Sequence, residues 1–407
     1  MILYKFVKPM VYPWNSAREP EQVNRLQNIS GDLTLNREKL FEIGREDILG
    51  FRKQTPSLSF SGMQFEYGSM EFWYDLANKL DPETGDNHYV TLDDLSDKKC
   101  ELATFLTDES DVFAGTLYLP NVRINGFSIN IGDPDSILER NFDLVSEKYR
   151  IIDENYLAYN DAEVGSEGDE EITLDPVAIE YATGKYIYRV LRVRAGVVSN
   201  LEEGAGDNQW SYVSGTAKLT VKDCETGDII KVYYAAATAS TIPAWTDKDT
   251  DPEVLLADYC EIRMKVGTGA AARIYRLQSV GMDVAFDRAD YKEIGNNEIV
   301  QTGVKTKTVT ISLNRFLENF TLEEILAGET GKPDIDPEEF ATDIQVQILV
   351  YGNKEHSGDI KIGYLSTGMT PSSTGFSDSV EEYMNKTTAL EGEALKISDD
   401  SSELAFI

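Results

Sequence analysis

Hydrophobic and polar residues alternate along several stretches of this chain, which is the pattern of half-buried β-strands. Residues 55–65 (TPSLSFSGMQF) and 306–316 (TKTVTISLNRF) both alternate with a period of two. Further β-rich stretches cover residues 115–131 and 343–365. Helical spacing is confined to short segments. The pattern therefore predicts a mainly β fold with few helices.

A short helix is predicted after each alternating strand. In the first, Ser69 is the expected N-cap, and one face of the helix is lined by Phe72, Trp73, Leu76, Ala77 and Leu80. In the second, residues 321–324 (TLEE) match a capping box, and Gly328 marks the end of the helix.

The order of strands and helix is repeated because part of the sequence is repeated. Residues 25–49 (RLQNISGDLTLNREKLFEIGREDIL) align without gaps on residues 276–300 (RLQSVGMDVAFDRADYKEIGNNEIV), at an offset of 251. The identical pairs are Arg25/Arg276, Leu26/Leu277, Gln27/Gln278, Asp32/Asp283, Arg37/Arg288, Glu42/Glu293, Ile43/Ile294, Gly44/Gly295 and Ile48/Ile299. So many identities in so short a block indicate a duplication.

Two copies of one domain, with something else between them, account for the length of the chain. The expected boundaries are 1–152 for the first copy, 153–257 for an acidic linker and insert domain, and 258–407 for the second copy. Residues 153–182 carry ten acidic side chains and neither Lys nor Arg, which predicts a solvated boundary segment. Residues 186–193, 217–221 and 229–234 are β-rich, the last two joined by the turn KDCETGD, and residues 243–253 form a second break. The predicted fold is two duplicated β-sandwich or barrel domains, each with a short α-helix, separated by a small all-β insert.

Charge narrows the range of partners. The 71 acidic and 38 basic side chains give a formal net charge of −33. Such a surface repels nucleic acid and anionic membranes, and it keeps a concentrated protein soluble. Adaptation to a salt-rich host is a second explanation that composition leaves open. No run of eighteen apolar residues occurs, and the N-terminal stretch lacks the order of a secretory signal.

Nothing in the sequence indicates catalysis or a cofactor. The chain has two histidines, His88 and His356, and three scattered cysteines, Cys100, Cys224 and Cys260, which suit reduced thiols rather than a zinc site. Residues 266–272 (VGTGAAA) resemble a dinucleotide fingerprint, but β-patterned sequence follows, so a hairpin loop is expected. Acidic turns at 81–87 and 247–251 lack the spacing of a calcium loop and are read as solvated turns. No enzyme, metal or cofactor is predicted.

The repeated block, with its RLQ strand, its DLTL strand and its EIG element at 42–44 and 293–295, resembles the tube (major tail) proteins of tailed phages and tailed archaeal viruses. This resemblance implies a β-sandwich or barrel with one helix beside it, whose neighbours join sheets around a ring. It also implies a long loop that contacts the next ring, here residues 37–53 and 288–305. The implied ring-stacking residues are Arg37, Glu42, Ile43, Gly44, Ile48, Phe51, Arg288, Glu293, Ile294, Gly295, Ile299 and Val304.

Two fused copies of a domain that forms six-membered rings would give a homotrimer with pseudo-sixfold symmetry. The implied role is a non-enzymatic structural protein of the virion, made in the host cytoplasm, whose stacked rings form a tail tube for DNA ejection. Its implied partners are other copies of itself and the tape measure, tail terminator and baseplate proteins, with a sheath if the tail contracts. DNA would pass without specific binding, and no membrane is involved.

Two other roles remain open at the level of sequence. One is a baseplate or tail-end protein of the same fold, present as a single ring. The other is a β-rich module that binds glycans or a cell surface through the insert, for which Trp210 and Tyr212 are the candidate exposed aromatic residues.

Overall fold

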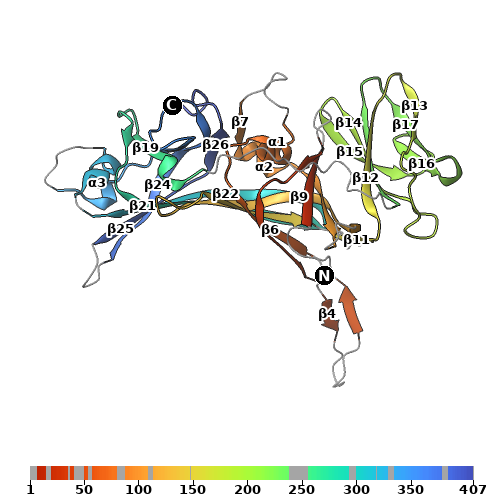
Figure 1. The fold of residues 1–407 in the computed structure, drawn as a ribbon, viewed down its shortest axis with the longest axis horizontal. Coiled ribbons are helices and arrows are strands. Elements are labelled where there is room, and N and C mark those ends of the chain that lie inside the picture. The colour runs from red at the N-terminus through yellow and green to blue at the C-terminus, as the bar shows by residue number, and fades with distance from the viewer. Residues whose placement is uncertain are drawn as a thin grey trace.

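The structure is a computed structural model of the chain (Figure 1). It describes residues 7–14, 20–34, 37–40, 50–53, 57–79, 88–108, 113–146, 148–237, 255–292, 299–317, 319–328, 334–377 and 384–406. Strands dominate this part of the chain, and its α-helices are short. The predicted mainly β, multi-domain fold is therefore confirmed.

One central sheet runs through both copies of the repeat. The first copy contributes β3 (Leu26–Thr34), β6 (Ser57–Phe65), β10 (Glu139–Ser146) and the second half of β9 (Phe113–Ile131). The second copy contributes β21 (Leu277–Lys292), β22 (Ile299–Phe316), β25 (Asn385–Gly392) and the second half of β24 (Ile360–Ser377). The spatial order is β3-β6-β10-β9-β21-β22-β25-β24, and all neighbours are antiparallel.

A smaller outer sheet packs on the same face of the central sheet in each copy. In the first copy it consists of β2 (Glu21–Gln22), β1 (Val7–Pro13), β8 (Cys100–Thr107), the first half of β9 and β11 (Arg150–Asp153). In the second it consists of β20 (Ala272–Arg273), β19 (Cys260–Val266), β23 (Ile344–Tyr351), the first half of β24 and β26 (Ala394–Ser398). The two copies therefore use the same elements in the same order.

The repeated RLQ sequence forms the corner where the chain enters the central sheet. Arg25 and Arg276 are both left-handed, with φ of 56° and 63°. At Gln27 and Gln278, two residues on, both strands shift register against their partners. A left-handed residue followed by a bulge turns the chain sharply. The identities at these positions thus reflect one backbone irregularity built twice.

A second corner is duplicated although the sequence does not reveal it. The long strands β9 and β24 pass from an outer sheet into the central sheet at Asn121 and Gly368, which have φ of 57° and 65°. Both strands then bulge at the same point, opposite Asp143 in β10 and Ala389 in β25. The spacing between these corners differs from the offset of the repeated block, so an ungapped alignment misses them.

The helices lie between the sheets, with α1 (Glu71–Ala77) in the first copy and α3 (Thr321–Leu326) in the second (Figure 1). Trp73 of α1 is fully buried, 4.6 Å from the ring of Phe127. The capping box predicted at 321–324 is wrong: Phe320 is the N-cap, and the amide of Thr321 donates instead to Oδ1 of Asn319. Gly328 does end α3, with φ of 68°.

A further helix, α2 (Leu92–Ser96), follows the short strand β7 (Tyr89–Thr91) and is capped by a box between Thr91 and Asp94. The strand β7 belongs to the first copy by sequence but pairs with β26 of the second. In the second copy, the described residues include no strand at the place of β7, and a short 3-10 helix, Pro337–Glu339, stands at the place of α2. The elements β7 and α2 tie the two copies together on the side of the outer sheets.

The insert forms its own group of seven strands at one end of the molecule (Figure 1). Its strands are β12 (Tyr156–Glu163), β13 (Gly168–Thr173), β14 (Ile187–Arg194), β15 (Val197–Glu203), β16 (Gln209–Val213), β17 (Lys218–Cys224) and β18 (Ile229–Ala236), in the order β12-β18-β14-β15-β16-β17-β13. The turn after β17 carries the chain across the insert, since β17 pairs with β13 and β16 whereas β18 pairs with β12 and β14.

The prediction that residues 153–182 are a solvated boundary segment is wrong. Both β12 and β13 lie within them and pair with β18 and β17. Ile172 points into the core of the insert, while Glu171 on the other side of β13 pairs with Lys218 at 2.6 Å. Acidic residues are abundant here because one side of each strand faces water.

Candidate functional site

The two copies meet at a junction between β9 and β21 inside the central sheet. Ile129 lies opposite Met282, and Phe127 lies opposite Val284. All four side chains are buried in the main hydrophobic cluster. This junction is therefore an apolar seam that holds the two halves of the sheet together.

The central sheet ends in two strands that lack a partner on their outer side among the described residues. These are β3, which pairs only with β6, and the second half of β24, which pairs only with β25. By its place in the repeat, β3 is the equivalent of β21, and β24 is the equivalent of β9. The two free edges are thus the counterparts of the two strands that form the junction inside the chain. Unpaired edges of this length readily pair with another chain.

One face of the central sheet is left open. The helices and outer sheets cover the other face (Figure 1), as the alternating burial along the strands requires. We call this uncovered surface the open face; it includes Asn28, Ser30, Asp32, Ser59, Ser61, Met63, Phe65, Gly126, Ser128, Asn130, Glu139, Asn141, Asp143, Val145, Gly281, Asp283, Ala285, Thr308, Thr310, Ser312, Asn314, Ser373, Gly375, Thr387, Ala389 and Glu391.

Small polar residues and carboxylates make up most of the open face, Met63, Phe65 and Val145 are its larger apolar residues, and none of the residues named above is Lys or Arg. The cations on the same strands point the other way: Lys307 pairs with Asp93 of α2, and Lys386 pairs with Glu323 of α3 at 2.7 Å. Lys305 lies at the bulge where β21 and β22 leave the sheet, 3.9 Å from Asp287. A surface of this kind offers a polyanion no charge to bind.

Two carboxylates lie close together in the middle of the open face. Asp283 on β21 is opposite Ser128, which is itself opposite Asn141 on β10, next to Asp143. Partial burial, together with the negative charge of Asp143, raises the pKa of Asp283 above its usual value. Asp143 accepts a hydrogen bond of 2.6 Å from the hydroxyl of Ser61. The negative charge of the face is therefore concentrated where the two copies join.

Two hairpins project from the ends of the sheet strands where the sequence predicts stacking loops. In the first copy, β4 (Arg37–Leu40) and β5 (Gly50–Lys53) form a ribbon that extends away from the body of the protein (Figure 1). Arg37 and Phe51 belong to this ribbon, and Ile299 begins β22 in the second hairpin. The EIG elements lie outside the described residues, namely Glu42, Ile43, Gly44 and Ile48 in the first hairpin and Glu293, Ile294 and Gly295 in the second.

Two of the predicted stacking residues make contacts within the chain. The guanidinium of Arg288 donates to the carbonyl oxygens of Ser96 in α2 and Ile124 in β9, at 2.7 and 2.6 Å. Val304, its partner across the hairpin, is half-buried against the main core. These residues anchor the base of the second hairpin to the first copy, and a contact with another ring stays a prediction for both.

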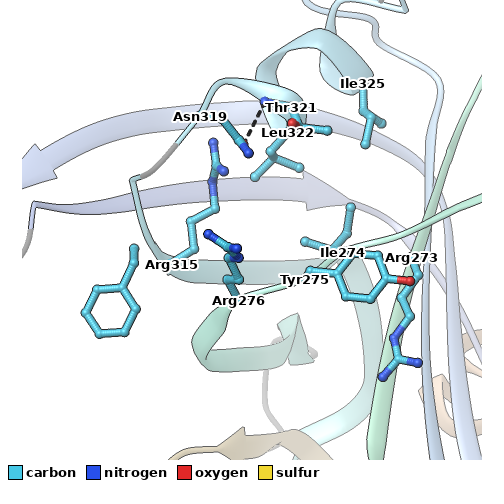
Figure 2. A pocket seen from close by; sticks show the side chains of 10 residues that line it. Arg273, Ile274, Tyr275, Arg276, Arg315, Asn319, Thr321, Leu322 and Ile325 are labelled. Carbon is cyan, nitrogen blue, oxygen red and sulfur yellow. Dashed lines mark hydrogen bonds between the residues drawn. The ribbon is translucent and has the colours of Figure 1, made fainter.

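A pocket of about 460 Å³ lies beside α3 at the opposite end of β21 and β22 from their hairpin. Figure 2 shows Arg276 and Arg315 reaching toward the helix, whose Leu322 and Ile325 form the apolar side. Arg315 is ion-paired with the buried Glu323. Burial alone would raise the pKa of that carboxyl, but hydrogen bonds from Lys386 and Arg315 hold it below its usual value.

The pocket reflects a difference between the two helices. In the first copy, Gln64 stands at the position of Arg315, and the longer helix α1 fills the space with Phe72 and Trp73. The shorter α3 has no aromatic side chain. The pocket is therefore the space that smaller residues leave, and its buried arginine already has a carboxylate partner.

The insert is packed firmly against the outer sheet of the first copy. Arg189 of β14 pairs with the buried Glu101 of β8 at 2.6 Å, and Glu101 also accepts from Tyr118 at 2.7 Å. Lys231 of β18 is buried and donates to the carbonyl oxygen of Pro13 at 2.9 Å. The cores of the insert and the outer sheet form one continuous cluster. The insert therefore lies on the side of the first copy that is opposite to the open face.

The candidate aromatic platform of the insert is not on its surface. Trp210 is only 7% exposed, and its indole nitrogen donates to the carbonyl oxygen of Leu201 at 3.0 Å. Tyr212 is half-buried against the ring of Tyr186, 5.3 Å away. A stacking surface for sugars at this position, as considered from the sequence, is therefore contradicted.

The remaining candidate sites from the sequence either have a structural role or lie outside the described residues. The loop at 266–272 joins β19 to β20 in an antiparallel hairpin, as predicted. His356 contacts the carbonyl oxygen of Asp258 and the guanidinium of Arg273. The acidic turns at 81–87 and 247–251 are not described, and no cluster of three or more His, Cys, Asp or Glu suited to a metal ion occurs in the described part. No described helix is long and apolar enough to cross a membrane.

These features define a class of protein: a duplicated β-sandwich protein whose sheet is open at both edges and uncovered on one polar, acidic face. Neither the models of protein families nor the curated proteins include a match to the chain. Among solved structures, a chain in the cryo-EM structure of the anti-feeding prophage baseplate, 6-fold symmetrised, is similar at 14% identity and a TM-score of 0.28. The similarity covers 36% of this chain and 92% of that chain. A likeness this weak identifies neither a family nor a function.

Proposed function

We propose that this chain is a non-enzymatic structural protein of a viral tail, which closes into rings of three copies and stacks into a tube that DNA traverses. The observation that carries this proposal is the identity of the free edges. The strands left unpaired at the ends of the central sheet are the counterparts of the strands that already pair at its centre.

Ring closure follows from repeating the internal junction between chains. If β24 of one chain joins β3 of the next as β9 joins β21, every junction in the ring is alike and no edge of the central sheet remains open. Each chain then supplies two of the equivalent positions in the ring. Three chains supply six, which is the number expected from the resemblance to tube proteins.

The open face would then line the interior of the ring. The insert and the outer sheets lie on the other side of the sandwich, so they would face outward. A lumen lined mostly by Ser, Thr, Asn, Gly and carboxylates would let a polyanion slide, because the open-face residues named above include no cation that would hold the phosphates. The hairpin of β4 and β5 would extend past the ring toward the next one, as proposed for residues 37–53.

The experiment that tests this proposal is negative-stain electron microscopy of the concentrated protein, with the mass measured on the same sample by light scattering. Rings with the mass of three chains, stacking into hollow tubes, are the expected result. Single rings that never stack would favour a baseplate or tail-end role for the same fold. A chain that stays monomeric at every concentration would refute the proposal.

A further inference from the structure

We infer that the side chain of Phe376 at the end of one chain seats in the gap left by Gly31 on the first sheet strand of the next chain, and that this pair sets the register and strength of the contact. The inference rests on the proposed ring and adds the residues that decide which strands meet and how. It commits to a second copy of this chain as the partner.

The repeat itself gives the register of the contact. Two ladders of three residues fix the equivalence of β9 and β24, because their last members are related by the offset of the repeated block: Ile129–Arg140–Gln64 and Phe376–Lys386–Arg315. Phe376 is therefore the counterpart of Ile129. Gly31 is the counterpart of Met282 by the same offset. Since Ile129 lies opposite Met282 inside the chain, Phe376 is expected opposite Gly31 between chains.

Phe376 has the properties of an unfilled interface position. Its side chain is 77% exposed, although it points to the covered face of the sheet, where Lys386 beside it pairs with Glu323. An aromatic side chain exposed on a free strand edge costs solubility unless a partner covers it. Burying it would contribute an affinity gain of about tenfold or more.

Gly31 leaves room for this side chain on the opposite edge. A Cβ atom placed on Gly31 would have Cδ2 of Phe60 and the carbonyl oxygen of Ser59 as its nearest neighbours, both at 3.9 Å. The position of a Cβ on Gly31 is thus uncrowded, with the ring of Phe60, itself only 7% exposed, beside it. The internal junction fills the equivalent space with two side chains of medium size, Ile129 and Met282. The external junction would fill it with the large side chain of Phe376 alone, because Gly31 has no side chain.

Exchanging the two pairs provides the test. Gly31→Met places at the free edge the residue that the internal junction has, and it should collide with Phe376 of the next chain. Phe376→Ile removes the large side chain and leaves a cavity. Each single variant should raise the concentration needed for ring formation by about tenfold or more, and the double variant, which rebuilds the internal Ile/Met pair, should return close to the wild type.

The control is Ser30→Met, which adds the same side chain to the neighbouring residue on the open face and should leave assembly nearly unchanged. The lone chain should tolerate Gly31→Met, because no close contact or left-handed φ restricts that position, and its melting temperature reports this. A double variant that assembles no better than the worse single variant would overturn the inference. So would a Gly31→Met protein that assembles like the wild type.

Cross-linking tests the register separately. With Asp32→Cys on β3, the directly opposite position in the inferred register is Gly375, and Ser373 and Ser377 lie two residues to either side. Oxidation should link chains through the Asp32→Cys, Gly375→Cys pair and much less through the other two pairs, because a disulfide spans only neighbouring Cα atoms. Rings that form but cross-link best through Ser373→Cys or Ser377→Cys would refute the register alone. A wild type that forms no rings would refute the proposed function as well.

Discussion

The loss of a single carboxylate at Glu66 should destabilise the first copy more than any surface change. Glu66 and Arg140 form an ion pair of 3.2 Å that is 1% and 0% exposed. The guanidinium of Arg140 lies against the rings of both Phe72 and Trp73, 4.9 Å from each centroid, and donates to Gln64 at 2.6 Å. Glu66→Gln leaves this buried cation without its counter-ion.

The expected cost is about 3–5 kcal/mol, the range observed when one member of a buried ion pair is removed. Glu66 also accepts from the amides of Tyr67 and Gly68 at 3.1 Å and from the hydroxyl of Tyr364 in the second copy at 3.2 Å. A glutamine oxygen can keep part of these bonds, so most of the loss comes from the charge of Arg140. Replacing both members, as Glu66→Gln with Arg140→Met, should recover about half of the loss or more, because no buried charge then remains.

The assay is urea unfolding followed by tryptophan fluorescence and far-ultraviolet circular dichroism, since Trp73 lies against Arg140. The matched control is Glu171→Gln, which breaks an exposed pair with Lys218 and should cost less than about 0.5 kcal/mol. If Glu66→Gln lowers the free energy of unfolding by less than about 1 kcal/mol, the ion pair is not buried away from water, and the prediction is wrong.

Three further predictions concern the central sheet. Burial and the charge of Asp143 raise the pKa of Asp283 in the folded chain above the ordinary value of 3.8. The ionised carboxylate therefore lowers the stability of the fold at pH values above the raised pKa, and this penalty is absent below pH 3.8, where the group is protonated in both the folded and the unfolded chain. Asp283→Asn should therefore raise the melting temperature at neutral pH, with the gain disappearing near pH 3, roughly one unit below the ordinary value; equal effects at both pH values would contradict this. Gly126→Ala places a Cβ 2.7 Å from the carbonyl oxygen of Val284 and should cost about 1–3 kcal/mol in urea unfolding, whereas Gly281→Ala, with open space around it, should be close to neutral. Assembled particles carrying Asp143→Lys and Asp283→Lys should bind DNA in fluorescence anisotropy with a steep loss at higher salt, and wild-type particles should not; binding by both would argue against an open face that repels DNA.

The sequence could predict the repeat and many of the strands because both depend on local patterns, namely identical residues at a fixed offset and alternating apolar and polar residues. The RLQ identities correspond to a left-handed residue and a bulge, which few residues satisfy equally well, so the pattern survived in both copies. The corner at Asn121 and Gly368 is as strongly duplicated in the backbone, yet two different residue types meet its left-handed requirement. Equivalent geometry without equal residues left no signal in one sequence.

Two errors in the sequence-based prediction have physical causes. The acidic stretch at 153–182 contains strands because the buried side of each strand needs only a few apolar residues, such as Leu157 in β12 and Ile172 in β13. The residues on the other side of each strand face water and can be charged. Trp210 appeared exposed because its neighbours are polar, although it lies in the core of the insert. By contrast, the capping box of α2 is visible in the sequence, because Asp94 follows Thr91 at a distance of three residues.

How the sheets associate could not come from the sequence, because β-patterning does not name the partner of a strand. Both β9 and β24 show alternation in their second halves, but only the structure places β9 beside β21 and leaves β24 at an edge. The same holds for the open face. Its carboxylates became identifiable only when the register assigned each residue to one side of the sheet.

If the proposed ring forms, the fusion of two copies in one chain would let its internal and external junctions evolve under different demands. The internal junction lies within one folded chain, so Ile129 and Met282 can be fully apolar and buried from the start. The external edges must stay soluble on a newly made chain, and the end of β24, which reads TPSSTGFS, meets this demand with small polar residues and with Pro371, which lacks an amide to donate. In such an edge a lone Phe376 contributes most of the apolar surface available for closure. Association through it would be weak for one contact and strong for a closed ring, in which every chain is held at both edges.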